Sequence, residues 1–441
     1  MAMLVGSAPS EDQEETAILQ ALVASIEDVP PLSVSRRLKN KHDQGISCVE
    51  RTLLARASKE LIDRALGWAI ADASGRADRA VGALVGLAVG DWVGAPLEFL
   101  EAVDEPAESR WDHAAFSCLN PNTKEIERGV LKPGQWSDDT AMSLCLADSL
   151  IMHGGLDGSD LRVRFWNWHA EGLNNAFRFD MDRPKRTSFG LGYNIAKSLM
   201  SLDPDGLVTA EYVNPGSNDS GNGGLMRLAP VPIFYAEPGQ LDAALAAARA
   251  SSLATHPGAL ATETAAFLAF VLHRAINLAE PARASGPRAF LDTCCSEYAA
   301  VLAGRLSEVE GSKGTEADSE MAALRELYAL VTSTKEGEQE QCWNWKSSEL
   351  GIMRTLKARG EKYNGHPVSK AYFGSYCMDG LAAALHAVAT TSSFNSAIER
   401  AVNFLGDSDT IGAIAGQIAG AFYGYASIDL RYVAALRQWD R

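Results

Sequence analysis

The pattern of hydrophobic and polar positions is helical along most of the chain. Apolar residues recur three and four positions apart in Ala/Leu-rich stretches, most clearly over residues 241–254, 259–275 and 376–390. The strict alternation that is typical of a β-strand is scarce. The sequence therefore predicts an all-α fold, a compact bundle of many helices joined by Gly- and Pro-rich segments.

Two of the predicted helices, at 81–94 and 411–424, carry a glycine at every fourth position. The glycines are Gly82, Gly86, Gly90 and Gly94 in the first series and Gly412, Gly416, Gly420 and Gly424 in the second. Each series lies on one face of its helix. A glycine inside a helix costs about 0.5–1 kcal/mol relative to alanine, so the close approach of another helix must compensate. We expect these two helices at the packed centre of the fold.

The same two regions are apolar enough, over 81–97 and 411–425, to raise the question of a membrane span. Asp91 interrupts the first stretch, and the second is shorter than the ~20 residues that a span requires. We interpret both as buried helices and predict no membrane contact.

Residues 1–75 differ in composition from the rest of the chain. They begin with acidic residues and later carry a basic cluster that consists of Arg36, Arg37, Lys39 and Lys41. We predict an N-terminal extension over 1–75 and a main domain over 76–441. The extension is either a solvated, partly helical segment or a docking arm for a partner protein. A second polar region, 307–349, is predicted to be a surface loop beside one exposed helix at 316–331.

Composition and charge narrow the class of protein. The 441 residues include 40 Lys and Arg against 56 Asp and Glu, a net charge of -16, and 46% are hydrophobic. The acidic excess argues against a broad surface for nucleic acid or anionic lipid, and the composition is that of a soluble, folded protein. The seven cysteines form no CxxC pair, and no signal-peptide pattern opens the chain. We therefore expect reduced thiols and a cytoplasmic location.

A run of polar residues precedes a predicted helix at 134–140. It contains Ser137, Asp138 and Asp139 in succession. A capping interpretation fits, because a serine side chain can accept a hydrogen bond from the first turn and acidic residues there are favoured by the helix dipole. A cap needs only one oxygen, however, and this run offers several.

A second run with the same pattern, 406–410, precedes the second glycine-striped helix. If the two runs meet, Asp138, Asp139, Asp407 and Asp409 bring four carboxylates to close range, where their repulsion would be destabilising. Two divalent cations would balance the four charges. Oxygen ligands without a nearby Cys or His pair favour hard ions such as Mg²⁺ or Mn²⁺ over zinc. Calcium suits the same ligands, although the chain has no EF-hand loop.

A glycine-rich run lies at 218–227 and reads Asn-Asp-Ser-Gly-Asn-Gly-Gly-Leu-Met-Arg. Such a run can present backbone N–H groups at close range, which is how loops hold phosphate without a basic surface. It matches neither the Walker pattern nor the dinucleotide fingerprint, and a plain turn is the alternative interpretation.

Two further residues are candidates for the same site. Glu98 follows Pro96 and is expected in a non-helical setting between apolar neighbours, where a partly desolvated carboxylate suits acid, base or orienting work. An exposed loop acid is the alternative. His256 is either a structural histidine or a ligand contact.

Four segments together resemble the ADP-ribosylglycohydrolase family. GDWVGAPLEF at 90–99 resembles its N-terminal motif, WSDDTAM at 136–142 its first metal motif, SGNGGLMR at 220–227 its phosphate loop, and GDSDTIGAIAG at 406–416 its final metal motif. They occur in the family's order, and the resemblance spans about residue 76 to the C-terminus. It implies an all-α orthogonal bundle with a two-Mg²⁺ centre that hydrolyses the bond between ADP-ribose and a protein side chain.

The resemblance also implies roles for individual residues. Metal oxygens would come from Ser137, Asp138, Asp139, Asp407, Asp409 and Thr410. Substrate contacts would come from Ser220, Gly221, Asn222, Gly223, Gly224, Met226 and His256. The catalytic set would be Glu98, Asp138 and Asp409, with Glu98 over the scissile bond. Water would attack the anomeric carbon with metal assistance, and the resemblance leaves the general base unassigned.

The sequence departs from the family pattern at two positions. Ser137 stands where threonine is common, and Leu405 stands where a second glycine is frequent. Neither change removes an oxygen ligand. The segment 157–194 lies where the family shapes its leaving-group pocket, and it leaves the choice between arginine and serine linkage open.

The leading interpretation is a Mg²⁺-dependent hydrolase of ADP-ribosyl-arginine in proteins. One alternative is a catalytically inactive protein of the same fold that binds ADP-ribose or a partner, and another is a hydrolase of a non-protein ADP-ribose conjugate. The intact acidic clusters favour an enzyme. The extension at 1–75 is similar to that of bacterial immunity proteins, and this implies an ADP-ribosyltransferase toxin as a partner.

Overall fold

The structure is a computed structural model. It describes residues 75–105, 109–118, 131–183, 187–202, 207–214, 220–312, 314–333, 341–360, 362–363, 366–367 and 371–439. The predicted extension and its basic cluster lie outside these residues, apart from Gly75, so its boundary and role stay predictions.

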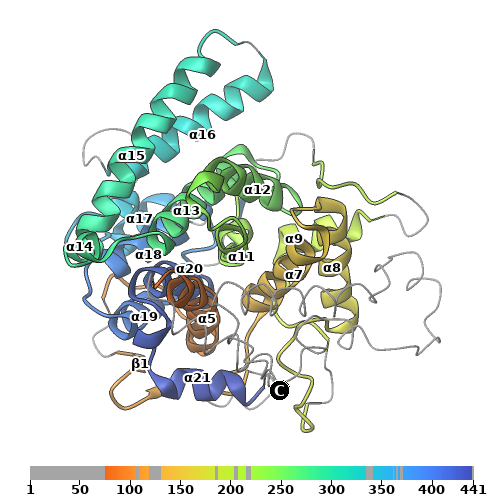
Figure 1. Ribbon diagram of the computed structural model, residues 1–441, viewed down its shortest axis with the longest axis vertical. Helices are drawn as coiled ribbons and strands as arrows, with labels where there is room; N and C mark the ends of the chain where they lie inside the picture. Colours follow the sequence, from red (N-terminus) through yellow and green to blue (C-terminus); the bar gives the residue numbers. More distant parts are fainter. Residues whose placement is uncertain are drawn as a thin grey trace, which may run out of the picture.

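The described chain is built from helices, as predicted (Figure 1). The α-helices are α5 (Arg76–Gly94), α7 (Asp138–His153), α8 (Gly158–Glu171), α9 (Tyr193–Met200), α10 (Gly223–Met226), α11 (Pro230–Phe234), α12 (Leu241–Leu253), α13 (Ala259–Ile276), α14 (Glu280–Arg283), α15 (Gly286–Val309), α16 (Thr315–Thr332), α17 (Ile352–Arg359), α18 (Cys377–Ala389), α19 (Phe394–Val402), α20 (Ser408–Tyr423) and α21 (Leu430–Arg437). Short 3-10 turns are η2 (Ala95–Leu97), η3 (Pro238–Gln240), η4 (Gln341–Trp343) and η5 (Tyr425–Ser427).

The strands of the described chain form two small antiparallel pairs. β1 (Trp111–Asp112) pairs with β2 (Ser117–Cys118), and β3 (Lys362–Tyr363) pairs with β4 (His366–Pro367). The all-α prediction is therefore confirmed. The three helices predicted most clearly appear as α12, α13 and α18, each with ends within one residue of the predicted bounds.

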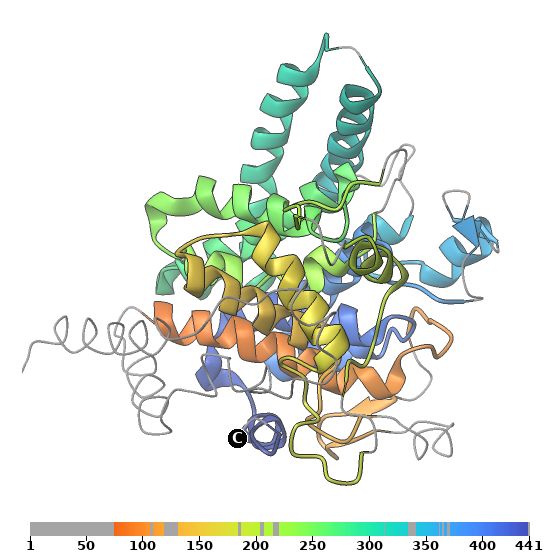
Figure 2. The same ribbon diagram turned by 90° about the vertical axis from the view of Figure 1, so that its right-hand side faces the viewer.

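The two glycine-striped helices, α5 and α20, lie side by side in the centre of the bundle (Figures 1 and 2). Gly86 faces Gly416 across the contact, and the pairs on either side follow the same register. A Cβ atom added to Gly86 would lie 2.9 Å from the carbonyl carbon of Gly416, inside ordinary van der Waals distance. The predicted close approach is confirmed, and it joins the end of α5 to the start of α20.

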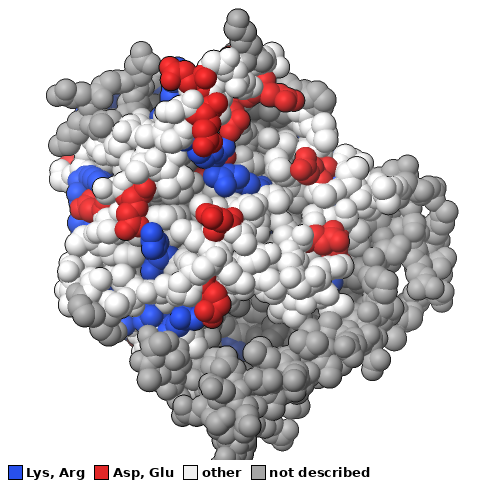
Figure 3. Space-filling model, turned by 45° about the horizontal axis from the view of Figure 1, so that its top comes forward, with Lys and Arg blue, Asp and Glu red and all other residues white. Residues whose placement is uncertain are grey.

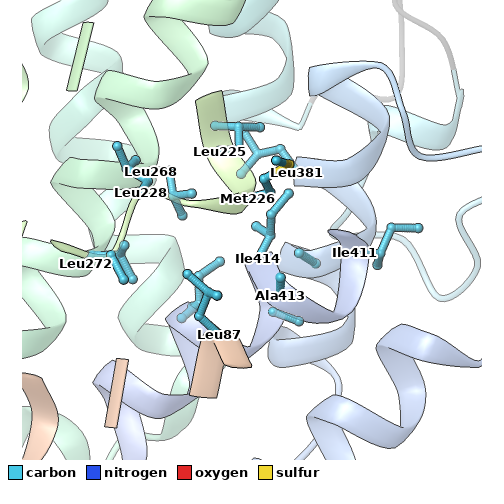
Figure 4. Close-up of a cluster of buried hydrophobic side chains, with 14 of the residues drawn as sticks. Leu87, Leu225, Met226, Leu228, Leu268, Leu272, Leu381, Ile411, Ala413 and Ile414 are labelled. Carbon is cyan, nitrogen blue, oxygen red and sulfur yellow. The ribbon is translucent and has the colours of Figure 1, made fainter. Parts of the chain in front are cut away.

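Hydrophobic side chains from several helices fill the space around this pair. Figure 4 shows Leu87 of α5, Ile414 of α20 and Leu381 of α18 in one cluster with Leu225 and Met226 of α10. The short helix α10 belongs to the glycine-rich run. Its apolar side chains therefore anchor that run in the core.

Two apolar segments, Arg76–Leu97 and Ala259–Ile276, are long enough to cross a membrane. In the fold, 61% of the first 18-residue window and 89% of the second are buried inside the protein. α20, which contains most of the second apolar stretch predicted from the sequence, is buried from Ser408 to Phe422. Such burial is typical of helices in the core of a protein, and it agrees with our interpretation of the two apolar stretches as buried helices.

The hairpin of α15 and α16 extends away from the bundle (Figures 1 and 2). The predicted exposed helix at 316–331 is α16, which buries one face that includes Leu324 and Leu327. About one turn before α15 ends, Arg305 pairs with the buried carboxylate of Glu263 from α13. On the described face in Figure 3, small groups of acidic and basic side chains lie beside one another, and no broad basic surface is seen there.

Candidate active site

The N-terminus of α7 is capped by two residues from different parts of the chain. Ser137 is the N-cap, as predicted, and its hydroxyl oxygen accepts from the Asp139 N–H at 3.4 Å. The buried Asp91 carboxylate of α5 accepts from the N–H groups of Ser137 and Thr140, each at 3.0 Å, and from the Thr140 hydroxyl at 2.6 Å. These bonds take up the N–H groups of Ser137, Asp139 and Thr140 without the side chain of Asp139, which leaves that carboxylate available for another role.

The start of α20 presents a second group of acidic side chains. Asp407 occupies the N-cap position, but within the described segment its carboxylate makes no capping bond. Instead it accepts from the Asn222 amide at 2.7 Å. Carboxylate oxygens of Glu98, Asp407 and Asp409 lie within 4.8 Å of one another. A capping interpretation therefore does not explain this group.

The two predicted polar runs meet in the fold. The hydroxyl of Thr410, in the first turn of α20, lies 3.5 Å from Oδ1 of Asp139 in α7. The other oxygen of Asp139 is buried and has no hydrogen-bond partner among the described residues. The structure thus brings carboxylates from three segments, which are 311 positions apart at the extremes (409 less 98), into one cluster at the end of the α5 and α20 pair.

Burial, and after it electrostatic repulsion, raises the pKa values of the carboxyl groups in this cluster. Burial, together with the carboxylates of Asp407 and Asp138, raises the pKa of Glu98 to about 9. Burial and the neighbouring carboxylates likewise raise the pKa values of Asp138, Asp139 and Asp409 well above their usual range. Groups so shifted stay protonated unless positive charge compensates them.

The donor set fits hard divalent cations. All the candidate ligand atoms are carboxylate or hydroxyl oxygens, and Asp139 offers a buried oxygen that lacks a partner in the described protein. Cations of this kind prefer oxygen ligands and would compensate the repulsion that raises the carboxyl pKa values. The residues present therefore fit the metal-ligand role predicted for them.

Glu98, a member of the cluster, lies in a non-helical segment, as predicted. It follows η2 and is partly buried, and its Oε1 accepts from the Tyr372 hydroxyl at 3.4 Å. The next residue, Phe99, has a left-handed backbone with φ of 65° and stacks on the Tyr372 ring at 5.4 Å. Its N–H donates to the Gly406 carbonyl at 2.9 Å, which ties the Glu98 segment to the start of the final acidic run.

The described part of the glycine-rich run, 220–227, packs between α18 and the segment around His256. Cys377 N–H donates to the Ser220 carbonyl at 2.9 Å, and Asn222 N–H donates to the Ser375 carbonyl at 3.0 Å. A Cβ added to Gly223 would lie 3.0 Å from His256 Nε2, which leaves no room for a larger side chain. The run is thus a fixed loop held against neighbouring elements rather than a plain surface turn.

Comparison with known proteins identifies the family. A sequence model described as ADP-ribosylglycohydrolase matches residues 72–441. The chain belongs to the ADP-ribosylglycohydrolase family. It is therefore an enzyme of a hydrolase family, and the resemblance seen in the four motifs is confirmed.

Named relatives of this ADP-ribosylglycohydrolase cover most of the chain. It is 27% identical over 364 residues to ADP-ribosylarginine hydrolase Tri1 of Serratia proteamaculans, a match that covers 82% of this chain and 76% of the relative. It is 27% identical over 365 residues to the ADP-ribosyl-[dinitrogen reductase] glycohydrolase of Rhodospirillum rubrum, covering 81% and 90%. A solved structure titled "ADP-ribosylglycohydrolase-related protein complex" has 27% sequence identity and a TM-score of 0.50, covering 83% of this chain and 95% of that one.

The structure places the predicted substrate-contact residues of the ADP-ribosylglycohydrolase in two kinds of position. Ser220, Gly221, Gly223 and Gly224 lie along the loop, where added Cβ atoms on the three glycines would meet His256 or Ser252. The side chains of Asn222 and Met226 contact an acidic residue and the hydrophobic core, respectively. Asn222 donates to Asp407, so it positions a predicted metal ligand. Met226 is 3% exposed and lies in the hydrophobic cluster, where its side chain anchors the loop.

Three residues at the site were given no role in the sequence analysis. Asp91 lies inside the N-terminal motif, and a carboxylate within a glycine-striped apolar helix is the signal that marks it. Tyr372 sits in an irregular segment and carries no such signal. Gly190 has φ of 71°, and a Cβ added there would lie 3.0 Å from Cγ of Asp138. The chain around Gly190 thus passes close to Asp138, one of the residues of the predicted metal motif.

Proposed function

We propose that this ADP-ribosylglycohydrolase is a Mg²⁺-dependent enzyme that removes ADP-ribose from arginine side chains of modified proteins in the cytoplasm. The observation that carries the proposal is the convergence of the acidic runs at the ends of α5, α7 and α20. The arginine linkage is supported by the relatives from Serratia proteamaculans and Pseudomonas putida that are named ADP-ribosylarginine hydrolases.

Six side chains would hold two Mg²⁺ ions, or Mn²⁺ in their place: Ser137, Asp138, Asp139, Asp407, Asp409 and Thr410. When bound, the ions supply Lewis-acid assistance at the ribose hydroxyls and at the attacking water. The chain's own residues set the geometry around them. Asp91 holds the first turn of α7, Asn222 holds Asp407, and Tyr372 holds Glu98.

The glycine-rich loop would bind the diphosphate of ADP-ribose, while the reacting ribose sits over the acidic cluster. The proton of the attacking water would pass to one of three carboxylates, Glu98, Asp138 or Asp409. Removal of that proton favours attack on the anomeric carbon as its bond to the arginine nitrogen breaks. The segment around Gly190 would line the leaving-group side, because it covers Asp138.

The test is release of free ADP-ribose from an arginine-ADP-ribosylated protein, with a serine-ADP-ribosylated peptide in parallel. Each substrate is incubated with Mg²⁺ or with a chelator. We expect Mg²⁺-dependent release from the arginine substrate, loss of that release in Asp409→Ala, and normal release in Asp318→Ala, which removes an exposed carboxylate on α16. Binding of ADP-ribose without release from any substrate would instead indicate an inactive binding protein of the same fold.

We also propose that the N-terminal extension binds an ADP-ribosyltransferase toxin. The family match begins at residue 72, so the acidic start and the basic cluster both precede it. Removal of residues 1–75 is expected to abolish toxin binding, measured by calorimetry, while hydrolysis of the arginine substrate survives. Unchanged toxin binding by the shortened protein would refute this proposal without affecting the hydrolase proposal.

A further inference from the structure

A buried arginine follows the glycine-rich loop. Arg227 has no solvent exposure, and its Nη2 donates to the Ser251 carbonyl at 3.1 Å and to the Thr255 hydroxyl oxygen at 2.7 Å. Its guanidinium lies 4.6 Å from the centroid of the Phe165 ring. Burial lowers the pKa of Arg227 to about 9, so the group is still charged at neutral pH. A guanidinium donates hydrogen bonds and accepts none.

This arginine determines the direction of the next hydrogen bond. Thr255 Oγ1 also lies 2.8 Å from Nδ1 of His256. Because the oxygen accepts from Arg227, the single hydroxyl hydrogen remains to be donated. Among the described residues, Nδ1 of His256 is the acceptor in reach of that hydroxyl. Nδ1 therefore carries the lone pair, and the proton of the neutral ring lies on Nε2.

The Nε2 edge of the ring faces the glycine-rich loop. A Cβ added to Gly221 would lie 2.9 Å from Nε2, and one added to Gly223 would lie 3.0 Å from it. The backbone of His256 is held on the other side, since its N–H donates to the Ser252 carbonyl at 2.7 Å and its carbonyl accepts from the Ser252 hydroxyl at 3.2 Å. The ring is thus fixed in place with a defined edge toward the loop.

We propose that Arg227 and Thr255 are positioning residues that fix the tautomer of His256, so that its Nε2–H donates a hydrogen bond to the diphosphate held by the glycine-rich loop. The proposal rests on the proposed function, because it takes the loop to be the diphosphate site. Neither residue needs to touch the substrate. A donor whose direction is set before binding requires no rearrangement when the anion arrives.

The experiment compares Thr255→Val, which keeps the shape of the side chain but has no hydroxyl, with Thr255→Ser, which keeps the hydroxyl. Thr264→Val is the matched control, because Thr264 is a buried threonine of α13 whose hydroxyl donates to the Leu260 carbonyl. The tautomer is read from ¹⁵N NMR of protein with labelled histidine rings, with the signals of His256 assigned through His256→Gln. Affinity for ADP-ribose is measured by calorimetry in the presence of Mg²⁺.

We expect the wild type, Thr255→Ser and Thr264→Val to carry the proton on Nε2 and to bind ADP-ribose with similar affinity. Thr255→Val should populate both tautomers and bind ADP-ribose more weakly by the inverse of the fraction of rings that keep the proton on Nε2, about twofold if the two tautomers are equally populated. A proton on Nδ1 in the wild type would overturn the proposal, and that measurement needs no variant to fold. Unchanged affinity in Thr255→Val would also overturn it. Failure of the wild type to bind ADP-ribose would overturn the proposed function. Active hydrolysis by a wild type that carries the His256 proton on Nδ1 would overturn this inference alone.

Discussion

Replacement of Gly86 by alanine should destabilise the protein, although alanine is the better helix former. In an open helix the change stabilises by about 0.5–1 kcal/mol. Here the added Cβ would lie 2.9 Å from the Gly416 carbonyl carbon and 3.1 Å from Cε2 of Phe394, whereas ordinary contacts begin at 3.4 Å. The Gly416 carbonyl oxygen would be closer still, so α5 and α20 must separate by about an ångström, which loosens the whole row of facing glycines.

Overpacking of this kind costs about 1–3 kcal/mol, and the contact is with rigid backbone, so we use the upper part of that range. After subtraction of the helical gain, Gly86→Ala should lower the free energy of unfolding by about 2 kcal/mol. Gly304→Ala is the matched control, since Gly304 lies in the exposed part of α15 and an added Cβ there meets nothing within 4 Å. That variant should gain about 0.5–1 kcal/mol.

The assay is thermal and urea-induced unfolding of the metal-free protein, with both variants and the wild type measured side by side. The same helix-forming gain enters both substitutions, so their difference isolates the contact between α5 and α20. If Gly86→Ala is as stable as Gly304→Ala, the helices have room for a methyl group and the packing argument is wrong. The effect of Gly86→Ala on Mg²⁺ affinity should be smaller than that of Gly412→Ala, because Gly412 lies one turn from the acidic cluster.

Three further predictions concern the cluster itself. Burial and mutual repulsion raise the pKa values of the carboxyl groups of the cluster in the folded metal-free protein. Protonation of these groups therefore stabilises the folded state. This contribution to stability is fully present below about pH 4 and is lost as the pH rises toward the folded-state pKa, about 9 for Glu98. Mg²⁺ should therefore raise the unfolding temperature more at pH 8 than at pH 5.5, and equal shifts would contradict this reasoning. Asp91→Asn should lower the free energy of unfolding by about 1–3 kcal/mol and should also weaken Mg²⁺ binding. The reason is that one amide oxygen cannot accept all the hydrogen bonds from Ser137 and Thr140. Unchanged Mg²⁺ affinity in calorimetry would count against this role of Asp91. Tyr372→Phe keeps the ring stack and removes the hydroxyl near Glu98, so kcat should fall while the unfolding temperature is retained, and an unaltered kcat would show that this bond is not needed.

Local patterns along the chain were enough to predict much of the architecture. Helical periodicity depends on neighbours three and four residues apart, and it placed α12, α13 and α18 to within one residue. The glycine series predicted the α5 and α20 contact, because a repeated cost on one helix face implies a close partner. The charges and oxygen atoms of the two acidic runs indicated shared cations, and this predicted that the runs lie close together in the fold.

Only the tertiary structure shows which residues from distant segments form hydrogen bonds with these acidic runs and fix their positions. Asp91 caps a helix that begins 47 residues later (138 less 91), and Asn222 reaches Asp407 across the fold. Tyr372 comes to Glu98 from an irregular segment with no periodic signal, and Met226 proved to face the hydrophobic cluster. Periodicity and short motifs describe residues a few positions apart. The partners of a buried polar group are chosen by the packing of distant segments, and that choice is made only when the chain has folded.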